Sequence, residues 1–236
     1  FASAVDSLMS VKKFVYDDKT VTLKELSDAL DVDWNGYEKL CLKIRNDAHK
    51  YGNHDKETDI YAAAIADFFS SRVSNIPNGR GGVYKVDMHS ARQFIEQGKK
   101  TLASADGRKN GNILSKNGSP CDGMDKNGAT ALIESALNLT PANFRESFGL
   151  DMMLHPSAVE GDDGLRILKA LLETYMESGG MTMQFNIFNS ETLRDAQKNP
   201  GKYRNLQVRV CGWNVLWNNL SREEQEAYIK RAENIK

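Results

Sequence analysis

The chain has 236 residues, 40% of them hydrophobic and 27% charged, a composition typical of globular proteins that excludes wholesale disorder. Its 31 Lys and Arg residues balance 32 Asp and Glu residues, so the net charge of −1 leaves no basic surplus for binding nucleic acid. No apolar run approaches the roughly 18 residues of a membrane span, and three cysteines are too few for a disulfide framework, so we expect a soluble, cytoplasmic protein.

The first residues already follow a helical pattern. Phe1, Ala4, Leu8, Val11 and Val15 recur at three- and four-residue intervals, as on an amphipathic helix. The chain opens inside this pattern without an initiator Met or the basic start of a signal peptide. We therefore expect it to be cut from a longer protein, and the alternative is a trimmed chain or an unseen leader.

Three further helices are predicted before residue 75. Thr22 and Glu25 form a capping box, in which each side chain satisfies a free backbone N–H of the first helical turn. The Asn35-Gly36 pair ends that helix before a third one from Tyr37 to about Lys50. A fourth helix is expected over Lys56 to Val73, and nothing in this region has catalytic spacing.

The pattern changes between residues 76 and 129. A turn cluster over 77–82 precedes an alternating run over 83–88, which predicts a strand. The stretch from Ser104 to Gly128 is rich in Gly, Asn, Asp and Ser and has no periodicity, which predicts a long, packed functional loop. It contains neither of the glycine patterns that bind nucleotide phosphates.

Helices and strands alternate from residue 129 onward. The expected helices span 130–139, 165–175 and 191–198, and the expected strands span 150–154, 181–188 and 208–210. A second capping box, Ser221 to Glu224, opens a terminal helix. This alternation predicts an α/β fold with parallel strand pairing.

The segment Arg209-Val210-Cys211-Gly212-Trp213 is the candidate functional motif. A glycine between two apolar strand-like segments ordinarily marks a bulge or a close backbone approach, and that structural interpretation stays open at this point. The segment also resembles the Arg-Val-x-Gly-Tyr signature of the glycyl radical enzymes, with Trp213 where Tyr is usual.

Four more blocks resemble the same family, in the family's order. They are Ser119–Gly128, His155–Ala158, Gly179–Asn186 and Glu191–Pro200. The chain is therefore identified as a member of the pyruvate formate-lyase-like glycyl radical enzymes. Around Gly212 its amino-acid sequence is most similar to that of the trans-4-hydroxy-L-proline dehydratases. The alternative is a diol- or choline-type lyase of the same family.

This resemblance implies a fold and a division of the chain. The fold is the C-terminal portion of a ten-stranded α/β barrel that includes the glycyl radical loop. Residues 1–118 would be the C-terminal helical part of the barrel domain, and residues 119–236 would be the glycyl radical domain.

The resemblance also implies that Gly212 stores the radical. An α-carbon radical is stabilised by both flanking amides when the Cα is planar, and glycine has no Cβ to clash with that geometry. Arg209 is expected to anchor the loop through a charge-assisted hydrogen bond. Shielding of the radical from water and oxygen is expected from Val210, Trp213, Val215 and Trp217.

The implied chemistry is the removal of water from trans-4-hydroxy-L-proline, giving 1-pyrroline-5-carboxylate, in a homodimeric enzyme. The Gly212 radical is the redox group, and no metal stays in the enzyme. A separate radical S-adenosylmethionine activase with an iron–sulfur cluster is the implied partner that installs the radical. His49 and His54 are expected in a polar turn rather than at a metal site.

The cysteines do not complete such an enzyme. The family's catalytic Cys lies in a Gly-Cys-x-Glu loop, and this chain contains no Gly-Cys pair. We expect Cys121 and Cys211 to be bystanders and Cys41 to fill a core. The thiyl Cys and the Glu acid/base would come from an N-terminal remainder, and the chain alone would be inert. The alternative from another class is a separately encoded, non-catalytic radical-domain subunit.

Overall fold

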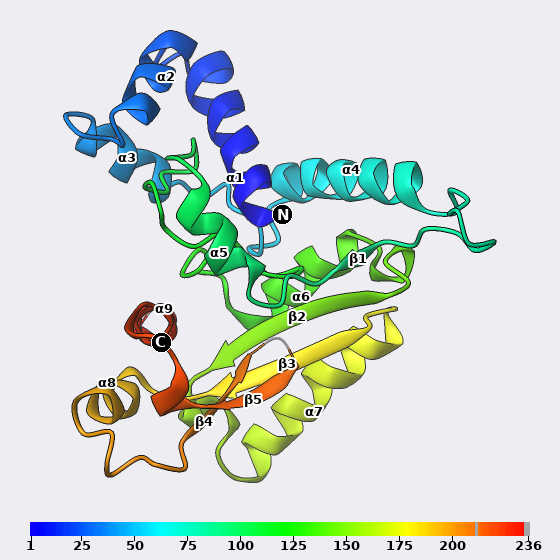
Figure 1. Cartoon of the computed structure of the whole chain (residues 1–236), viewed down its shortest axis with the longest axis vertical. Helices are drawn as coiled ribbons and strands as arrows, with labels where there is room; N and C mark the ends of the chain where they lie inside the picture. The colour runs from blue at the N-terminus through cyan, green and yellow to red at the C-terminus, as the bar shows by residue number, and fades with distance from the viewer. Residues whose placement is uncertain (211, 234–236) are drawn as a thin grey trace.

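The computed structural model describes residues 1–210 and 212–233. Its first part is helical, as predicted (Figure 1). The elements are α1 (Ala2–Val11), which continues as a π-helical segment (Lys12–Asp17), α2 (Leu23–Asp31), α3 (Glu38–Arg45) and α4 (Lys56–Val73). The capping box of α2 is present, because the Thr22 hydroxyl accepts from Glu25 N at 3.1 Å and the Glu25 carboxylate accepts from Thr22 N at 2.8 Å.

The third helix ends at Arg45 rather than near Lys50. The carboxylate of Asp47 accepts a hydrogen bond from His49 N at 2.9 Å, which gives the backbone an alternative to the next helical turn. Lys50 then turns inward, and its ammonium group donates to Ser10 Oγ at 3.3 Å.

A parallel sheet follows, in the order β1 (Asp87–Met88), β2 (Ser147–Leu154) and β3 (Thr182–Ile187). Figure 1 shows the helices of the first hundred residues on one side of this sheet and α7 (Gly161–Glu177), which connects β2 to β3, on the other. The predicted α/β class with parallel pairing is confirmed.

One local prediction around this sheet is wrong. The alternating run over 83–88 is a strand only at its last two residues, because Val83 instead forms an isolated antiparallel bridge with Pro77. Helix α5 (Gln93–Lys100) lies in a stretch for which no element was predicted, and it contains Gly98 although glycine disfavours helices. A Cβ at Gly98 would lie 2.6 Å from the carbonyl oxygen of Asn112, so the close packing of the loop requires glycine there.

The stretch from residue 101 to 127 forms no helix or strand beyond an isolated bridge, and its Ser115–Pro120 segment is buried, so the packed loop is confirmed. Helix α6 (Gly128–Asn138) follows it, and a short 3-10 turn (Pro141–Asn143) leads into β2. The largest hydrophobic cluster contains residues from both predicted parts of the chain, 1–118 and 119–236, for example Val5 together with Leu132 and Phe148.

The last elements enclose a second cluster of buried side chains. They are α8 (Ser190–Lys198), β4 (Gln207–Val210), β5 (Trp213–Leu216), a 3-10 turn (Trp217–Asn219) and α9 (Arg222–Glu233). The second capping box is present, with Ser221 N donating to the Glu224 carboxylate at 2.8 Å. In residues 1–210 and 212–233, no helix is long and apolar enough to cross a membrane.

Candidate functional site

Gly212 lies in the turn of an antiparallel hairpin formed by β4 and β5. The strands pair Arg209 with Asn214 and Val210 with Trp213, which leaves two residues for the turn. Gly212 has a φ of +95°, and among the described residues no heavy atom outside its chain neighbours lies within 4 Å of the position that a Cβ would take. Two-residue hairpin turns favour glycine at such a φ, so backbone conformation rather than lack of space selects glycine here.

Side chains of β3 and α9 hold this hairpin in place. Asn186 accepts from Arg209 N at 2.8 Å and donates its own amide to the Arg209 carbonyl at 2.9 Å. The Tyr228 hydroxyl donates to the same carbonyl at 2.9 Å. Nearer the tip, Gln184 Oε1 accepts from Gly212 N at 2.7 Å. The hairpin is therefore fixed through its backbone by polar side chains from two other elements.

The base of the hairpin is also held by apolar packing. Val208 and Val210 of β4 are buried in the C-terminal cluster together with Trp217, which is fully buried. The Trp217 ring meets the Tyr228 ring edge-on, with the centroids 6.4 Å apart. Such an aromatic pair stabilises the base of the hairpin beyond simple burial.

The residues predicted around Gly212 occupy different environments. Arg209 donates from Nη1 to Asn214 Oδ1 at 3.0 Å, a charge-assisted hydrogen bond that crosses the hairpin. Val210 is buried, but Trp213 is 63% exposed and meets the ring of His89 with the centroids 6.3 Å apart. Gly212 itself is exposed.

The predicted apolar shield is therefore incomplete within the described chain. Trp213, Val215 and Trp217 lie at alternate positions, and their burial increases from the tip toward the base, where Trp217 is 0% exposed. Gly212 and Trp213 are both exposed within the described chain, and the role of Trp213 as a shield for Gly212 stays a prediction.

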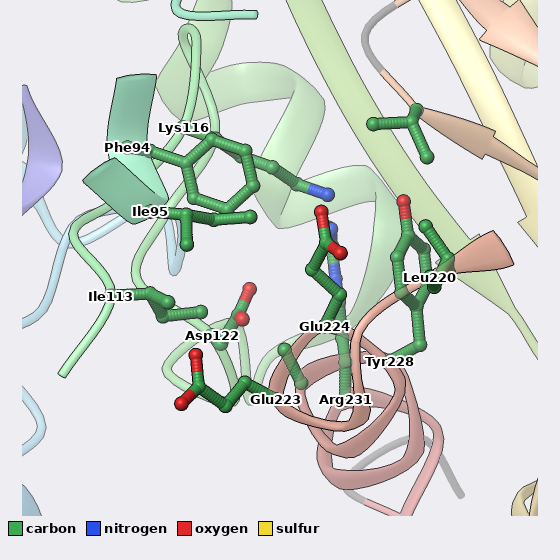
Figure 2. A pocket seen from close by; sticks show the side chains of 12 residues that line it. Phe94, Ile95, Ile113, Lys116, Asp122, Leu220, Glu223, Glu224, Tyr228 and Arg231 are labelled. Atoms are coloured by element: carbon green, nitrogen blue, oxygen red, sulfur yellow. The ribbon is translucent and has the colours of Figure 1, made fainter. Parts of the chain in front are cut away.

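A buried group of charges lies beneath the hairpin. Figure 2 shows Lys116, Arg231 and Tyr228 around a small, mainly apolar pocket. Arg231 Nη2 donates to the Asp151 carbonyl at 2.5 Å, and Lys116 Nζ lies 4.0 Å from the Asp151 carboxylate. Burial, the largest single effect, lowers the pKa of Lys116, but the charges of Asp151, Tyr228 and Asp122 together outweigh it, so the pKa is raised and Lys116 stays protonated.

Two cysteines can be placed relative to this site. Cys41 is buried in the first helical cluster, which confirms it as core filler. Cys121 Sγ lies 3.5 Å from Ser3 Oγ and packs against the largest cluster, not the cluster beneath the hairpin, and burial raises the pKa of its thiol. Its role as a bystander stays a prediction. Cys211 lies outside the described residues.

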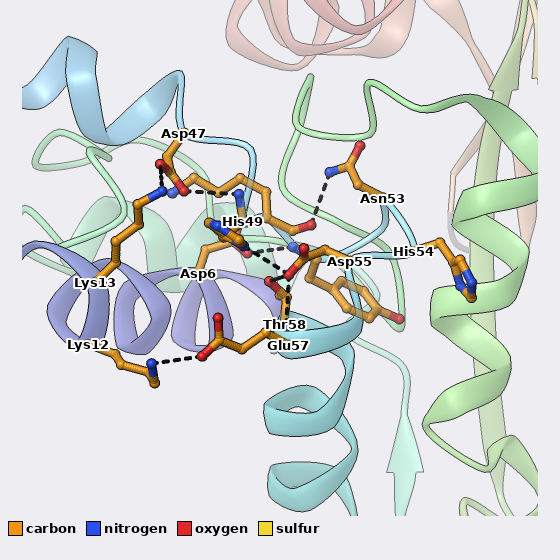
Figure 3. Close-up of polar contacts among 12 residues, drawn as sticks. Asp6, Lys12, Lys13, Asp47, His49, Asn53, His54, Asp55, Glu57 and Thr58 are labelled. Atoms are coloured by element: carbon orange, nitrogen blue, oxygen red, sulfur yellow. Dashed lines mark hydrogen bonds and ion pairs between the residues drawn. The ribbon is translucent and has the colours of Figure 1, made fainter. Parts of the chain in front are cut away.

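His49 and His54 lie in a polar region near α4, which Figure 3 shows from close by. His49 Nδ1 lies 3.1 Å from the Asp55 carboxylate, while His54 points toward α6, where its Nδ1 lies 3.5 Å from the Glu134 carboxylate. Within the described part of the chain, no group of three or more His, Cys, Asp or Glu side chains could hold a metal ion.

Asp6, also in Figure 3, is a buried carboxyl whose pKa is raised to about 7, mainly by burial. An unfolded Asp has a pKa of about 3.9, so the folded protein binds this proton more tightly between roughly pH 4 and pH 7. The stability contributed by protonated Asp6 is therefore present below about pH 4 and is lost as the pH rises to about 7.

Asp6→Asn is expected to remove this pH dependence. Asparagine keeps an oxygen that can accept from Tyr51 N, as Asp6 Oδ1 does at 2.9 Å. Between pH 4 and pH 8, the unfolding free energy of the wild type should fall relative to that of the variant by roughly 3–4 kcal/mol. Urea unfolding of both proteins across this range measures the difference, and parallel pH profiles would contradict the expectation.

Sequence reasoning did not find the side chains that hold the hairpin. Gln184 and Asn186 lie in one of the recognised sequence blocks, but nothing local in that block indicates contact with Arg209 or Gly212. Tyr228 lies in the terminal helix that the second capping box predicts, and no local pattern indicates its contact with Arg209. The available signal was the pair of amide side chains at alternate positions of a strand whose other face, Met183, Phe185 and Ile187, is apolar.

Comparisons with known proteins agree with this arrangement. The family model described as "Glycine radical" matches residues 114–218, and the one described as "Pyruvate formate lyase-like" matches residues 1–98. Trans-4-hydroxy-L-proline dehydratase of Clostridioides difficile is 36% identical, over 97% of this chain and 29% of its own length. The 4-hydroxyphenylacetate decarboxylase glycyl radical subunit of the same species is 34% identical, over 97% of this chain and 28% of its own.

Solved structures of the same kind superpose closely. Hydroxyproline dehydratase from Clostridioides difficile matches with a TM-score of 0.93 at 35% identity, over 98% of this chain and 29% of its own. The B12-independent glycerol dehydratase from Clostridium butyricum matches with a TM-score of 0.91 at 34% identity, over the same shares of the two chains. The chain thus spans under a third of the length of these relatives, and the expected fold, part of the α/β barrel of such enzymes, is confirmed. Together, the two family models and these relatives show that the chain belongs to the glycyl radical enzymes.

Proposed function

We propose that this chain is the radical-bearing part of a glycyl radical lyase and that Gly212 is the residue that stores the radical. The observation that carries the proposal is the position of Gly212 at φ +95° in a two-residue turn, inside the segment matched by the glycine radical model. A glycine with open space around its α-carbon among the described residues lets a planar α-carbon radical form without displacing any of them.

The neighbouring residues have supporting roles in this proposal. Arg209 holds the two strands together through Asn214, and Val210 anchors β4 in the C-terminal cluster. Because Gly212 and Trp213 are exposed in the described chain, their cover would come from the remainder of the protein or from Trp213 turning inward.

The substrate we propose is trans-4-hydroxy-L-proline. Two observations support this substrate: the 36% identity to trans-4-hydroxy-L-proline dehydratase and the resemblance of the amino-acid sequence around Gly212 to that subfamily. The Gly212 radical would take a hydrogen atom from a cysteine thiol in the remainder of the protein. The resulting thiyl would take the hydrogen next to the ring nitrogen, and the C4 hydroxyl would leave as water with a proton from the Glu of the Gly-Cys-x-Glu loop. The product radical would then take a hydrogen atom back from the same cysteine, which regenerates the thiyl and, through it, the Gly212 radical.

The same proposal includes the partners and the division of the chain. A radical S-adenosylmethionine activase would generate the Gly212 radical, and the enzyme would be a homodimer. The boundary between the barrel part and the radical domain would lie near residue 118, which the ends of the two matched segments, 98 and 114, support.

The experiment is a substrate panel on the activated natural full-length protein. Under anaerobic conditions, with activase and S-adenosylmethionine, we expect 1-pyrroline-5-carboxylate from trans-4-hydroxy-L-proline. We expect no turnover of glycerol, 1,2-propanediol or 4-hydroxyphenylacetate, the compounds suggested by other relatives. Turnover of a diol without turnover of trans-4-hydroxy-L-proline would show that the proposed substrate is wrong, while the proposed class, a glycyl radical lyase, would stand.

The 236-residue chain serves as the second arm of this experiment. We expect it to be inert alone, because it contains no Gly-Cys-x-Glu loop. Turnover by this chain that is lost in Cys121→Ser would overturn the assignment of Cys121 as a bystander.

A further inference from the structure

The hairpin that carries Gly212 is joined to the parallel sheet through side chains. The described strands fall into two sheets, β1-β2-β3 and β4-β5, so β3 and β4 do not share a backbone ladder. Gln184 and Asn186, two residues apart on β3, instead reach the hairpin with their side-chain amides. We call these two residues the amide pair.

The two members of the amide pair do different things. Asn186 makes two hydrogen bonds, to both backbone groups of Arg209, and so holds β4 as a neighbouring strand would. Gln184 makes a single contact at the tip, where its Oε1 accepts from Gly212 N at 2.7 Å. Because a backbone N–H can only donate, this contact requires the oxygen of the Gln184 amide to face Gly212.

Gln184 has a buried side chain that contacts the Gly212 N–H. Its side chain is 9% exposed, and its Nε2 has no hydrogen-bond partner among residues 1–210 and 212–233. Among the described residues, no heavy atom beyond the chain neighbours lies within 4 Å of where a Cβ of Gly212 would stand. The N–H bond to Gln184 is therefore the contact that orients the Gly212 amide at the tip, while the base of the hairpin is held by Asn186 and Tyr228.

We infer that Gln184 is a positioning residue for the radical, which orients the Gly212 amide and sets how the unpaired spin is shared. The inference rests on the proposed function of Gly212. In an α-carbon radical the amide nitrogen donates electron density toward the half-filled orbital. An acceptor on the N–H makes that nitrogen more electron-rich, so Gln184 strengthens the donation and draws spin onto the nitrogen.

The test compares two variants that each remove one member of the amide pair. Gln184→Met keeps the length of the side chain without its amide, and Asn186→Leu removes the two bonds to Arg209 and leaves Gln184 intact. Both are made in the natural full-length protein, labelled with ¹⁵N-glycine and activated anaerobically. Electron–nuclear double resonance then measures the ¹⁵N coupling, and electron paramagnetic resonance measures the splitting by the α-proton.

We expect Gln184→Met to lower the ¹⁵N coupling and to raise the α-proton splitting, and we expect Asn186→Leu to leave both at the wild-type values. Gln184→Glu should restore the wild-type couplings. A glutamate at this position is the register partner of Asp151, so it would be protonated, and its carbonyl oxygen could still accept from Gly212 N. Loss of the radical in Gln184→Met with a normal radical in Gln184→Glu would also support the inference.

Three outcomes would overturn it. Wild-type couplings in Gln184→Met would show that the N–H bond has no influence on the radical. Equal shifts in Gln184→Met and Asn186→Leu would mean that any loosening of the hairpin has this effect. Loss of the radical in both Gln184→Met and Gln184→Glu would show that an acceptor oxygen for the Gly212 N–H is not sufficient to maintain the radical. Failure of the proposed function is distinguishable, because the wild type would then show no glycine-centred radical at all.

Discussion

Gly212→Ala is expected to abolish the organic radical while leaving the fold almost unchanged. The residue has a φ of +95°, so a Cβ there costs about 1–2 kcal/mol of backbone strain. It would meet no heavy atom within 4 Å in residues 1–210 and 212–233 beyond its chain neighbours, so those residues add no steric cost. The chemical loss should be complete, because the methyl group clashes with the planar arrangement that shares the spin between the two amides. Electron paramagnetic resonance after activation of the natural protein measures the radical.

The matched control is Gly179→Ala. Gly179 has a φ of +92° and likewise has no heavy atom of the described chain, apart from its neighbours in sequence, within 4 Å of its Cβ position, so the backbone strain should be equal. Urea unfolding of the unactivated proteins should show similar small losses of stability in both variants, and only Gly212→Ala should lose the radical. A radical of normal intensity in Gly212→Ala would refute the assignment of the site.

The parts of the fold that could be predicted depend on local sequence signals. The helix over residues 56–73 was expected with the bounds that the structure gives it. The capping boxes at Thr22 and Ser221 form because their partners lie three residues away. The buried strand around Met152 and the parallel pairing follow from apolar content and from the alternation of strands with helices.

The parts that could not be predicted depend on contacts distant in sequence. Helix α5 contains Gly98, which is explained only by the close approach of Asn112. The contact of Gln184 with Gly212 spans 28 residues and joins two sheets. The exposure of Trp213 depends on how far the hairpin projects, and strand alternation alone does not determine this.

Exposure to air is expected to break the backbone of the activated protein at Gly212. A carbon-centred radical combines with O₂ at close to the rate of encounter, and the peroxyl product decays with cleavage of the chain at that residue. Packing around the tip offers little protection in the described chain, because Gly212 is exposed and Trp213 is 63% exposed. Cover from the remainder of the protein would slow the reaction but not change where the chain breaks.

Mass spectrometry of the activated natural protein after exposure to air tests the position of the radical most directly. We expect a C-terminal peptide that begins around Trp213 in the activated sample, and no such peptide in an unactivated sample treated in the same way. Activated Gly179→Ala should yield the same peptide as the wild type, and activated Gly212→Ala should yield none. Cleavage at another residue, or cleavage around Trp213 without activation, would show that Gly212 is a structural turn glycine and does not hold the radical.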